Sequence, residues 1–135
     1  MSKIVITGGL GYIGTQLSKL YIEDNLNHEV HIVDSRFLPE RVKELKSWGF
    51  KYHQVDILDK EFFQDMLSDA DIVYHLAGVT DVAYVKSESN DEQDNKIKTV
   101  GIDGTNNIIQ SVGETTKLIF PSTHVVYEGF DDTVF

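Results

Sequence analysis

The sequence predicts an α/β fold, a doubly wound parallel sheet of about five strands in the order 3-2-1-4-5 with helices on both faces. One observation and two general rules lead to this prediction. Short apolar runs alternate with longer amphipathic segments along the 135 residues, a pattern typical of strands alternating with helices. This alternation produces parallel strands joined by crossover helices, which cover both faces of the sheet. Because such crossovers are almost always right-handed, few topologies remain.

The five expected strands are short runs rich in β-branched and aromatic residues. The first, at 3–7, reads K-I-V-I-T and ends at two glycines, and the second, at 29–34, reads E-V-H-I-V-D. Three further runs at 50–54, 71–75 and 117–121 have similar length and character. Runs of this length bounded by turn residues are typical of buried strands.

Four segments between these runs have apolar residues at helical spacing. They lie at 12–25, at 39–48, at 60–67 and within 90–112. The second begins at Pro39, a residue favoured in the first turn of a helix. The apolar residues with this spacing are Tyr12, Ile13, Leu17, Leu20 and Tyr21 in the first segment, Val42, Leu45 and Trp48 on one face of the second, and Ile97, Val100, Ile108 and Val112 on the apolar side of the last.

Composition limits the classes of function. A content of 41% hydrophobic and 25% charged residues is typical of a globular protein, and the length predicts one domain, 1–135. The net charge of −10 repels nucleic acid and anionic membranes, so neither is an expected partner. There is no run of about 18 apolar residues that could span a membrane.

Cysteine and histidine usage limits the chemistry further. The absence of cysteine excludes disulfides and thiolate metal sites and fits a cytoplasmic protein. The five histidines form no close-set ligand pair, so no metal site is expected. His31, His53 and His75 lie on or beside expected strands, where hydrogen-bonded structural histidines are expected.

The most informative segment is 7–14, T-G-G-L-G-Y-I-G, which follows the first strand and opens the first helix. Gly8 is expected to allow the tight turn out of the strand, and Gly11 to let a pyrophosphate approach the backbone. Gly14 is expected to let the helix pack close to the sheet. The free N–H groups and the dipole of the helix N-terminus favour an anion. The segment therefore predicts a dinucleotide-binding (Rossmann) fold.

An acidic residue about 20 positions after the last glycine completes this fingerprint. Asp34 ends the second strand at that distance from Gly14. A carboxylate there accepts hydrogen bonds from both hydroxyls of the adenosine ribose and repels a 2′-phosphate, so NAD is expected rather than NADP. Arg36 would favour NADP, but as an exposed arginine it is expected to be solvated. The alternative is a purely structural turn, with Asp34 an ordinary residue at a strand end.

With these residues in place, the chain resembles the extended short-chain dehydrogenase/reductase family, and within it the NAD-dependent nucleotide-sugar epimerases and dehydratases. The spacing T-G-x-x-G-x-x-G at 7–14 is that of the extended branch. Three further segments match in order: V-D-I at 55–57, H-L-A-G at 75–78 and F-P-S-T-H-V-V-Y at 120–127. The resemblance covers the chain from Lys3 to about position 127.

The resemblance implies a role for each segment. Asp56 is implied to bond the adenine amino group and the N–H of Ile57 to meet the adenine ring, while 76–78 line the ribose and nicotinamide side. Thr123 falls on the catalytic Ser/Thr position, which hydrogen-bonds the reacting hydroxyl. The residues implied to hold NAD are Gly8, Gly11, Tyr12, Ile13, Gly14, Asp34, Asp56, Ile57, Leu76, Ala77 and Gly78.

Two departures from the family pattern stand out. Relatives have Asn-x-x-Gly-Thr before strand five, whereas Gly101 takes the asparagine position here and Gly104 and Thr105 are kept. Relatives also need Tyr-x-x-x-Lys on the next helix, where the tyrosine is the acid/base and the lysine lowers its pKa. None of the six tyrosines here has a lysine four positions later. The chain is therefore expected to be the N-terminal, NAD-binding part of a longer enzyme, truncated before the sixth strand and the substrate-binding region, and inactive alone.

Two functions remain open at this stage. In the first, the parent protein is an enzyme, expected to be a homodimer, that transfers hydride at a sugar hydroxyl or keto carbon of a nucleoside-diphosphate sugar. In the second, the chain is a non-catalytic dinucleotide-binding module, regulatory or for interaction, complete at this length. A Tyr-x-x-x-Lys within about 15–25 residues after Phe135 would favour the enzyme.

Overall fold

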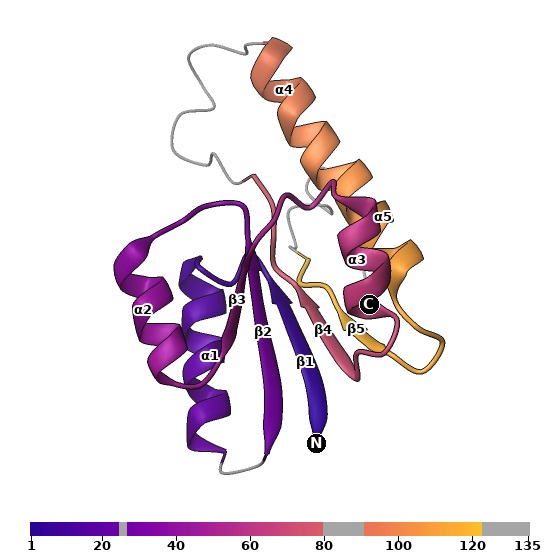
Figure 1. Cartoon of the computed structure of the whole chain (residues 1–135). Helices are drawn as coiled ribbons and strands as arrows, with labels where there is room; N and C mark the ends of the chain where they lie inside the picture. Colours follow the sequence, from indigo (N-terminus) through magenta and orange to yellow (C-terminus); the bar gives the residue numbers. More distant parts are fainter. Residues whose placement is uncertain (25–26, 80–90, 123–135) are drawn as a thin grey trace, which may run out of the picture.

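A computed structural model describes residues 1–24, 27–79 and 91–122, without the side chains of 91–94. It contains a five-stranded parallel sheet in the order β3-β2-β1-β4-β5, which confirms the predicted topology (Figure 1). The strands are β1 (Ser2–Thr7), β2 (His28–Asp34), β3 (Lys51–Gln54), β4 (Ile72–His75) and β5 (Lys117–Ile119). The helices are α1 (Tyr12–Glu23), α2 (Pro39–Ser47), α3 (Lys60–Leu67), α4 (Asp91–Lys98) and α5 (Gly104–Ser111), the last two joined by a π-helical turn, η1 (Thr99–Asp103).

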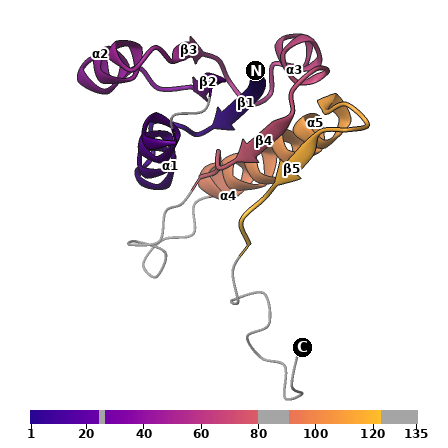
Figure 2. The ribbon, with the colours of Figure 1, turned by 90° about the horizontal axis from the view of Figure 1, so that it is seen from below.

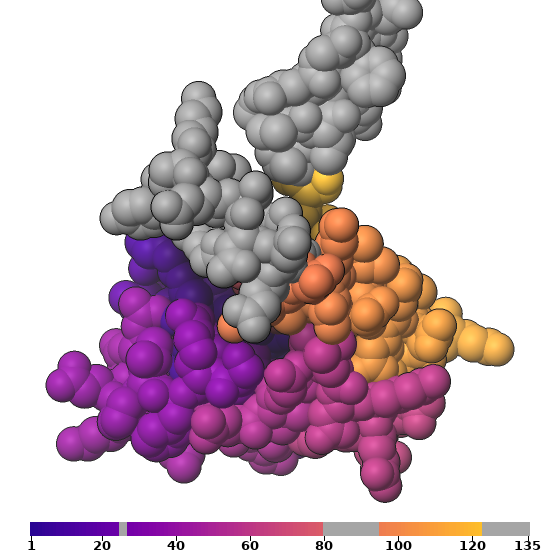
Figure 3. Space-filling model, turned by 90° about the horizontal axis from the view of Figure 1, so that it is seen from above, coloured from indigo at the N-terminus to yellow at the C-terminus, as the bar shows by residue number. Residues whose placement is uncertain are grey.

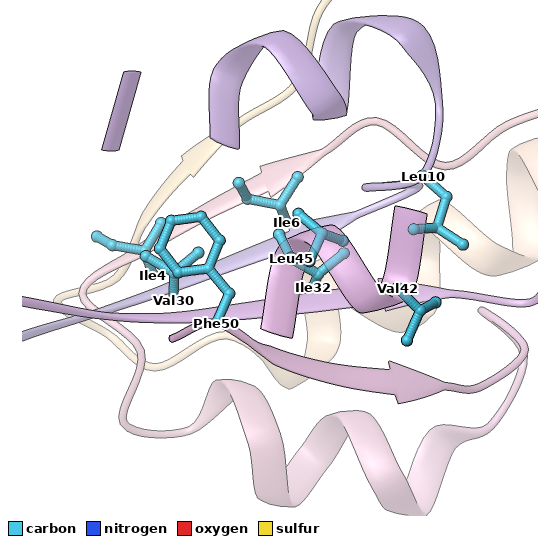
Figure 4. Close-up of a cluster of buried hydrophobic side chains, with 8 residues drawn as sticks. All are labelled: Ile4, Ile6, Leu10, Val30, Ile32, Val42, Leu45 and Phe50. Carbon is cyan, nitrogen blue, oxygen red and sulfur yellow. The ribbon is translucent and has the colours of Figure 1, made fainter. Parts of the chain in front are cut away.

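The alternation of side chains along β1 and β2 divides the core into two layers. Helices α1 and α2 cover one face of the sheet and α3 and α5 the other (Figures 1 and 2). The α2 side is a cluster of buried aliphatic and aromatic side chains (Figure 4): Ile4, Ile6, Leu10, Val30, Ile32, Val42, Leu45 and Phe50. The opposite layer contains Val5, Val33, Ile57, Phe63, Leu67, Ala70, Val73 and Ile108. The central strands are thus buried on both faces, as expected for a parallel sheet.

Helix α1 turns its small residues to the core. Its fully buried positions are the small residues Gly14 and Ser18, with Leu17 and Tyr21 half-buried beside them. Small residues allow the helix backbone to approach its neighbours closely, and this approach fixes the helix rotation. Four of the apolar side chains that indicated helical spacing are exposed: Tyr12 at 79%, Ile13 at 62%, Leu20 at 61% and, on α4, Ile97 at 39%.

The sheet register brings three strand ends together at one edge. Thr7, the last residue of β1, pairs with Val33 of β2 and His75 of β4. The segments that follow these strands therefore lie side by side at the carboxyl edge, where open α/β sheets bind ligands. Figure 3 views the molecule from the side of this edge, with the purple surface of the first half of the chain on the left and the orange surface of the second half on the right.

Two negative findings apply to the described part of the chain. None of its helices combines the length and apolar character needed to cross a lipid bilayer. Among the described side chains, those of 1–24, 27–79 and 95–122, there is also no group of three or more His, Asp or Glu placed to hold a metal ion.

Candidate functional site

The turn after β1 has the backbone conformation predicted for Gly8. Its φ is +67°, in the left-handed region that favours glycine. A Cβ atom on Gly8 would also lie 2.7 Å from the backbone nitrogen of Ala77 and 2.8 Å from its Cα. The residue at position 8 must therefore be glycine for two reasons, the turn itself and the close approach of the segment after β4.

The two other close contacts of the loop involve Gly14 and Gly9. A Cβ on Gly14 would lie 2.6 Å from the Cα of Gly9, so Gly14 allows α1 to pack closely against the backbone that directly follows β1. A Cβ on Gly9 would lie 2.4 Å from the Cγ2 of Ile32 on β2. Sequence reasoning missed this role of Gly9, although the paired glycines at the end of β1 are its signal.

Gly11 is different because the space beside it is open. A Cβ there would meet only the carbonyl oxygen of Gly8, at 3.2 Å. Gly11 is the N-cap of α1, and its helix has neither a side-chain cap nor an acidic residue in the first turn. The first N–H groups of a helix have no intrahelical partner, and here they begin at the exposed Tyr12 and Ile13. This helix end can therefore bind an anion through its N–H groups and its dipole.

The carboxylate of Asp34 is buried and joined to the loop. Its Oδ2 accepts a hydrogen bond of 3.1 Å from the N–H of Leu10, and its Oδ1 accepts one of 3.0 Å from the N–H of Arg36. The Arg36 guanidinium also donates to both oxygens, through Nε at 3.1 Å and Nη2 at 3.2 Å. The expectation that Arg36 is merely solvated is therefore wrong, because the carboxylate two residues away is close enough to pair with it.

Arg41, on the first turn of α2, contacts the same loop residue, Leu10, at its carbonyl group. Its Nη1 donates to the carbonyl oxygen of Leu10 and, at 3.2 Å, to the hydroxyl of Thr15 on α1. The backbone of Leu10 is thus held at its N–H by Asp34 and at its C=O by Arg41. No pattern in the sequence predicted the role of Arg41, because the contact joins residues 31 positions apart.

The segment after β3 places Asp56 and Ile57 next to α5. Asp56 is exposed and its Oδ1 accepts a hydrogen bond of 2.9 Å from the N–H of Leu58. Ile57 is buried, and a Cβ on Gly104 would lie 2.6 Å from its Cγ2. The side-chain amide of Asn107 donates to the Ile57 carbonyl at 2.8 Å. Gly104 and Asn107 therefore fix the position of this segment, and Asn107 was missed by sequence reasoning.

A buried histidine orders the segment after β4. The Nδ1 of His75 lies 2.8 Å from the hydroxyl of Thr7, and its Nε2 lies 2.9 Å from the hydroxyl of Thr105 on α5. The N–H of Ala77 donates to the same Thr7 hydroxyl at 3.3 Å. Burial lowers the pKa of His75 to about 4. A neutral ring accepts at one nitrogen and donates at the other, so His75 is a hydrogen-bonded structural histidine, as predicted, and holds the start of 76–78.

The other two strand histidines, His31 in the middle of β2 and His53 near the end of β3, contact each other. His31 Nδ1 is 2.9 Å from His53 Nε2, and His31 Nε2 is 2.9 Å from the carboxylate of Glu29. Burial lowers the pKa of both histidines. His31 lines a cavity of about 310 Å³ together with Lys3, Glu29 and residues of α3. Both are hydrogen-bonded, so the structural interpretation of these histidines is confirmed too.

The carboxyl edge thus combines most of the predicted residues. Gly8, Gly11, Tyr12, Ile13 and Gly14 form one side of it. The other residues implied to hold the cofactor follow β2, β3 and β4: Asp34, Asp56, Ile57, Leu76, Ala77 and Gly78. Thr123, the implied catalytic residue, lies outside the described residues.

Sequence relatives share most of this chain but are much longer. UDP-N-acetyl-alpha-D-glucosaminuronate decarboxylase of Bacillus cytotoxicus is 30% identical over 127 residues, which cover 93% of this chain and 37% of the relative. UDP-glucose 4-epimerase of Mycoplasma genitalium is 29% identical, again over 93% of this chain and 37% of the relative. The chain therefore spans little more than a third of the length of these two curated relatives.

The fold has solved counterparts. A UDP-glucose-4-epimerase from Stenotrophomonas maltophila, crystallised with bound NAD and formylated UDP-arabinopyranose, superposes with a TM-score of 0.76 at 23% identity and covers 98% of this chain and 40% of its own. Residues 5–133 also match the 3-beta hydroxysteroid dehydrogenase/isomerase family. The resemblance to extended short-chain dehydrogenases/reductases is confirmed, and the chain belongs to the 3-beta hydroxysteroid dehydrogenase/isomerase family.

Proposed function

We propose that this chain, residues 1–135, is the NAD-binding domain of a longer nucleoside-diphosphate-sugar epimerase or dehydratase that acts by hydride transfer at a sugar hydroxyl or keto carbon. The observation that carries the proposal is the uncapped N-terminus of α1 behind an open Gly11, with Asp34 at the end of the next strand. The names of the two curated relatives, both of which refer to UDP-sugars, support the substrate class.

The residues of the carboxyl edge fit a dinucleotide. The N–H groups of Tyr12 and Ile13 would bind its pyrophosphate, which approaches the backbone at Gly11. Asp34 would accept hydrogen bonds from the adenosine ribose, and Asp56 and the N–H of Ile57 would meet the adenine. When bound, the nicotinamide takes up and returns a hydride, and Thr123 would hydrogen-bond the reacting oxygen. Because the sequence contains no Tyr-x-x-x-Lys pair, the chain alone is expected to bind NAD without turnover.

Calorimetric titration of the chain with NAD and NADP tests this proposal. The chain is expected to bind NAD more tightly than NADP, and Gly11→Val to abolish binding while keeping the wild-type circular dichroism, since a Cβ at Gly11 meets a single atom. The matched control is Gly101→Val, because no atom lies within 4 Å of the added Cβ there. Wild-type-like binding by Gly11→Val, or no binding by the wild type, would overturn the proposal.

The gene sequence after Phe135 distinguishes the enzyme hypothesis from the hypothesis of a non-catalytic module. A Tyr-x-x-x-Lys motif encoded within about 15–25 residues after Phe135 supports the enzyme. A stop codon there supports the dinucleotide-binding module.

Homodimerisation and a cytoplasmic location complete the proposal. The exposed apolar side chains Ile97, Ile102 and Ile109, at 39%, 59% and 53%, support a second copy packing along α4, η1 and α5. Sedimentation equilibrium is expected to give the mass of a dimer, and a monomer at micromolar concentration would contradict it. Fractionation of cells expressing the tagged protein tests the location.

A further inference from the structure

Four donors occupy the carboxylate of Asp34. Two are backbone N–H groups, from Leu10 and Arg36, and two belong to the Arg36 guanidinium, which contacts one carboxylate oxygen through Nε and the other through Nη2. A carboxylate offers about four acceptor positions, and the bidentate fork fills two of them. A ribose diol that needs both oxygens therefore meets an acceptor that already has partners.

The two members of this ion pair differ in freedom. The side chain of Asp34 is 4% exposed, whereas that of Arg36 is 56% exposed. The backbone beneath the guanidinium is fixed independently, because the Tyr52 hydroxyl donates to the Arg36 carbonyl and the Gln54 amide donates to the Ser35 carbonyl at 3.3 Å. The guanidinium can therefore leave the carboxylate by rotating its own side chain, while the backbone stays in place.

We propose that Arg36 is a specificity-determining residue that competes with the adenosine ribose for Asp34 and, once displaced, places a cation beside the ribose 2′ position. This inference rests on the proposed dinucleotide function. The competition weakens the binding of NAD. The displaced guanidinium offsets the repulsion between the Asp34 carboxylate and a 2′-phosphate. The preference for NAD over NADP is therefore smaller than it would be with Asp34 alone.

The test compares the dissociation constants of NAD and NADP for the wild type and Arg36→Ala. Loss of an exposed competitor is expected to tighten NAD binding about two- to fivefold. Loss of a charge-assisted contact to the 2′-phosphate is expected to weaken NADP binding about tenfold or more. Substitution of Asp34 is a poorer test, because that side chain also holds the N–H of Leu10 in the glycine loop.

Two further variants make the result specific. Lys46→Ala removes the same charge from an exposed position in the last turn of α2 and is expected to leave the NAD-to-NADP ratio unchanged. Arg36→Gln removes the charge while keeping a polar side chain, and replaces Arg36→Ala if circular dichroism shows that the alanine variant is unfolded. Either folded Arg36 variant is expected to move the ratio in the same direction.

Three outcomes overturn the inference. A ratio within twofold of the wild type in the folded Arg36 variants removes the role of Arg36, and an equal change in Lys46→Ala assigns the effect to net charge. Failure of the wild type to bind either nucleotide overturns the proposed function, and the inference with it. Binding by the wild type with an unchanged ratio in the variants overturns this inference alone.

Discussion

The imidazole Nδ1 of His75 lies 2.8 Å from the hydroxyl of Thr7, two residues that are 68 positions apart in the chain. The opposite ring nitrogen contacts Thr105, so one neutral side chain joins β4, β1 and α5. In the neutral ring one nitrogen accepts a hydrogen bond from its threonine hydroxyl and the other donates one, and protonation of the ring removes the acceptor. The carboxyl edge of the sheet therefore depends on the charge state of His75.

Acidification is expected to destabilise the fold through this histidine. The pKa of His75 is lowered to about 4 from the ordinary value of 6.5, so the unfolded chain binds a proton that the folded chain does not. Stability is full above about pH 6.5 and falls as the pH drops toward 4, by at most about 1.4 kcal/mol per pH unit. Urea unfolding between pH 7.5 and 5 measures this slope. His31 and His53 contribute in the same direction, because burial lowers their pKa as well.

His75→Phe keeps a ring of similar size and removes the titration. This variant is expected to be less stable at pH 7.5, since two contacts are lost, but its stability should decline less steeply on acidification. An unchanged slope would assign the pH dependence to other groups.

Substitution of Gly14 is expected to destabilise the loop. A methyl group there would lie 2.6 Å from the Cα of Gly9 and 2.8 Å from its carbonyl oxygen, and backbone atoms cannot rotate away. Gly14→Ala is expected to cost about 1–3 kcal/mol of unfolding free energy. Gly101→Ala is the matched control, since the added methyl has no neighbour within 4 Å, and replacing a helical glycine is expected to be neutral or to stabilise by up to about 1 kcal/mol. Equal effects of the two variants in urea unfolding would contradict the packing observed at Gly14.

Arg41→Ala is expected to loosen the glycine loop from α2. The Leu10 carbonyl and the Thr15 hydroxyl lose a charged donor, which costs roughly 1–3 kcal/mol for a half-buried hydrogen bond to a charged group. Lys43→Ala, at an exposed position of the same helix, is expected to change stability by less than about 0.5 kcal/mol. Thermal unfolding of the two variants measures the difference. A loss no larger in Arg41→Ala than in Lys43→Ala would show that the loop holds its shape without Arg41.

Asn107→Ala is expected to leave the buried carbonyl of Ile57 without its donor. The amide of Asn107 reaches that carbonyl at 2.8 Å, and an unpaired buried acceptor costs about 1–3 kcal/mol. The neighbouring Asn106→Ala is a matched control, because Asn106 is exposed. Hydrogen exchange at 56–58 and urea unfolding are expected to change only in the Asn107 variant, and a similar response of both variants would rule out the role assigned to Asn107.

Local patterns in the sequence were enough to predict the sheet and its order. Burial alone produces the β-branched runs of β1 and β2 and the helical spacing of Val42 and Leu45. The periodicity of apolar residues is therefore enough to predict these elements. The glycine loop was equally predictable, because its spacing follows from the turn after β1 and the start of α1. Most of the candidate site is assembled from these local features.

The contacts that hold the site in shape were not predictable in this way. The rotation of α1 depends on the approach of Gly14 to Gly9, and the pairing of Arg36 with Asp34 depends on the path of the loop after β2. Arg41 and Asn107 act across 31 and 50 residues. Such contacts depend on tertiary geometry, which periodicity does not record.

The strand order also has a kinetic consequence. Strand β1 lies at the centre of the sheet, between β2 and β4, yet its pairing with β4 joins residues 68 positions apart. Closing a long loop costs entropy before the contact is made, so pairing of β1 with the nearer β2 is favoured first. During synthesis the side of β1 that faces β4 therefore stays unpaired until β4 has been made. Only then can Thr7 pair with His75 and bring the carboxyl ends of these two strands together.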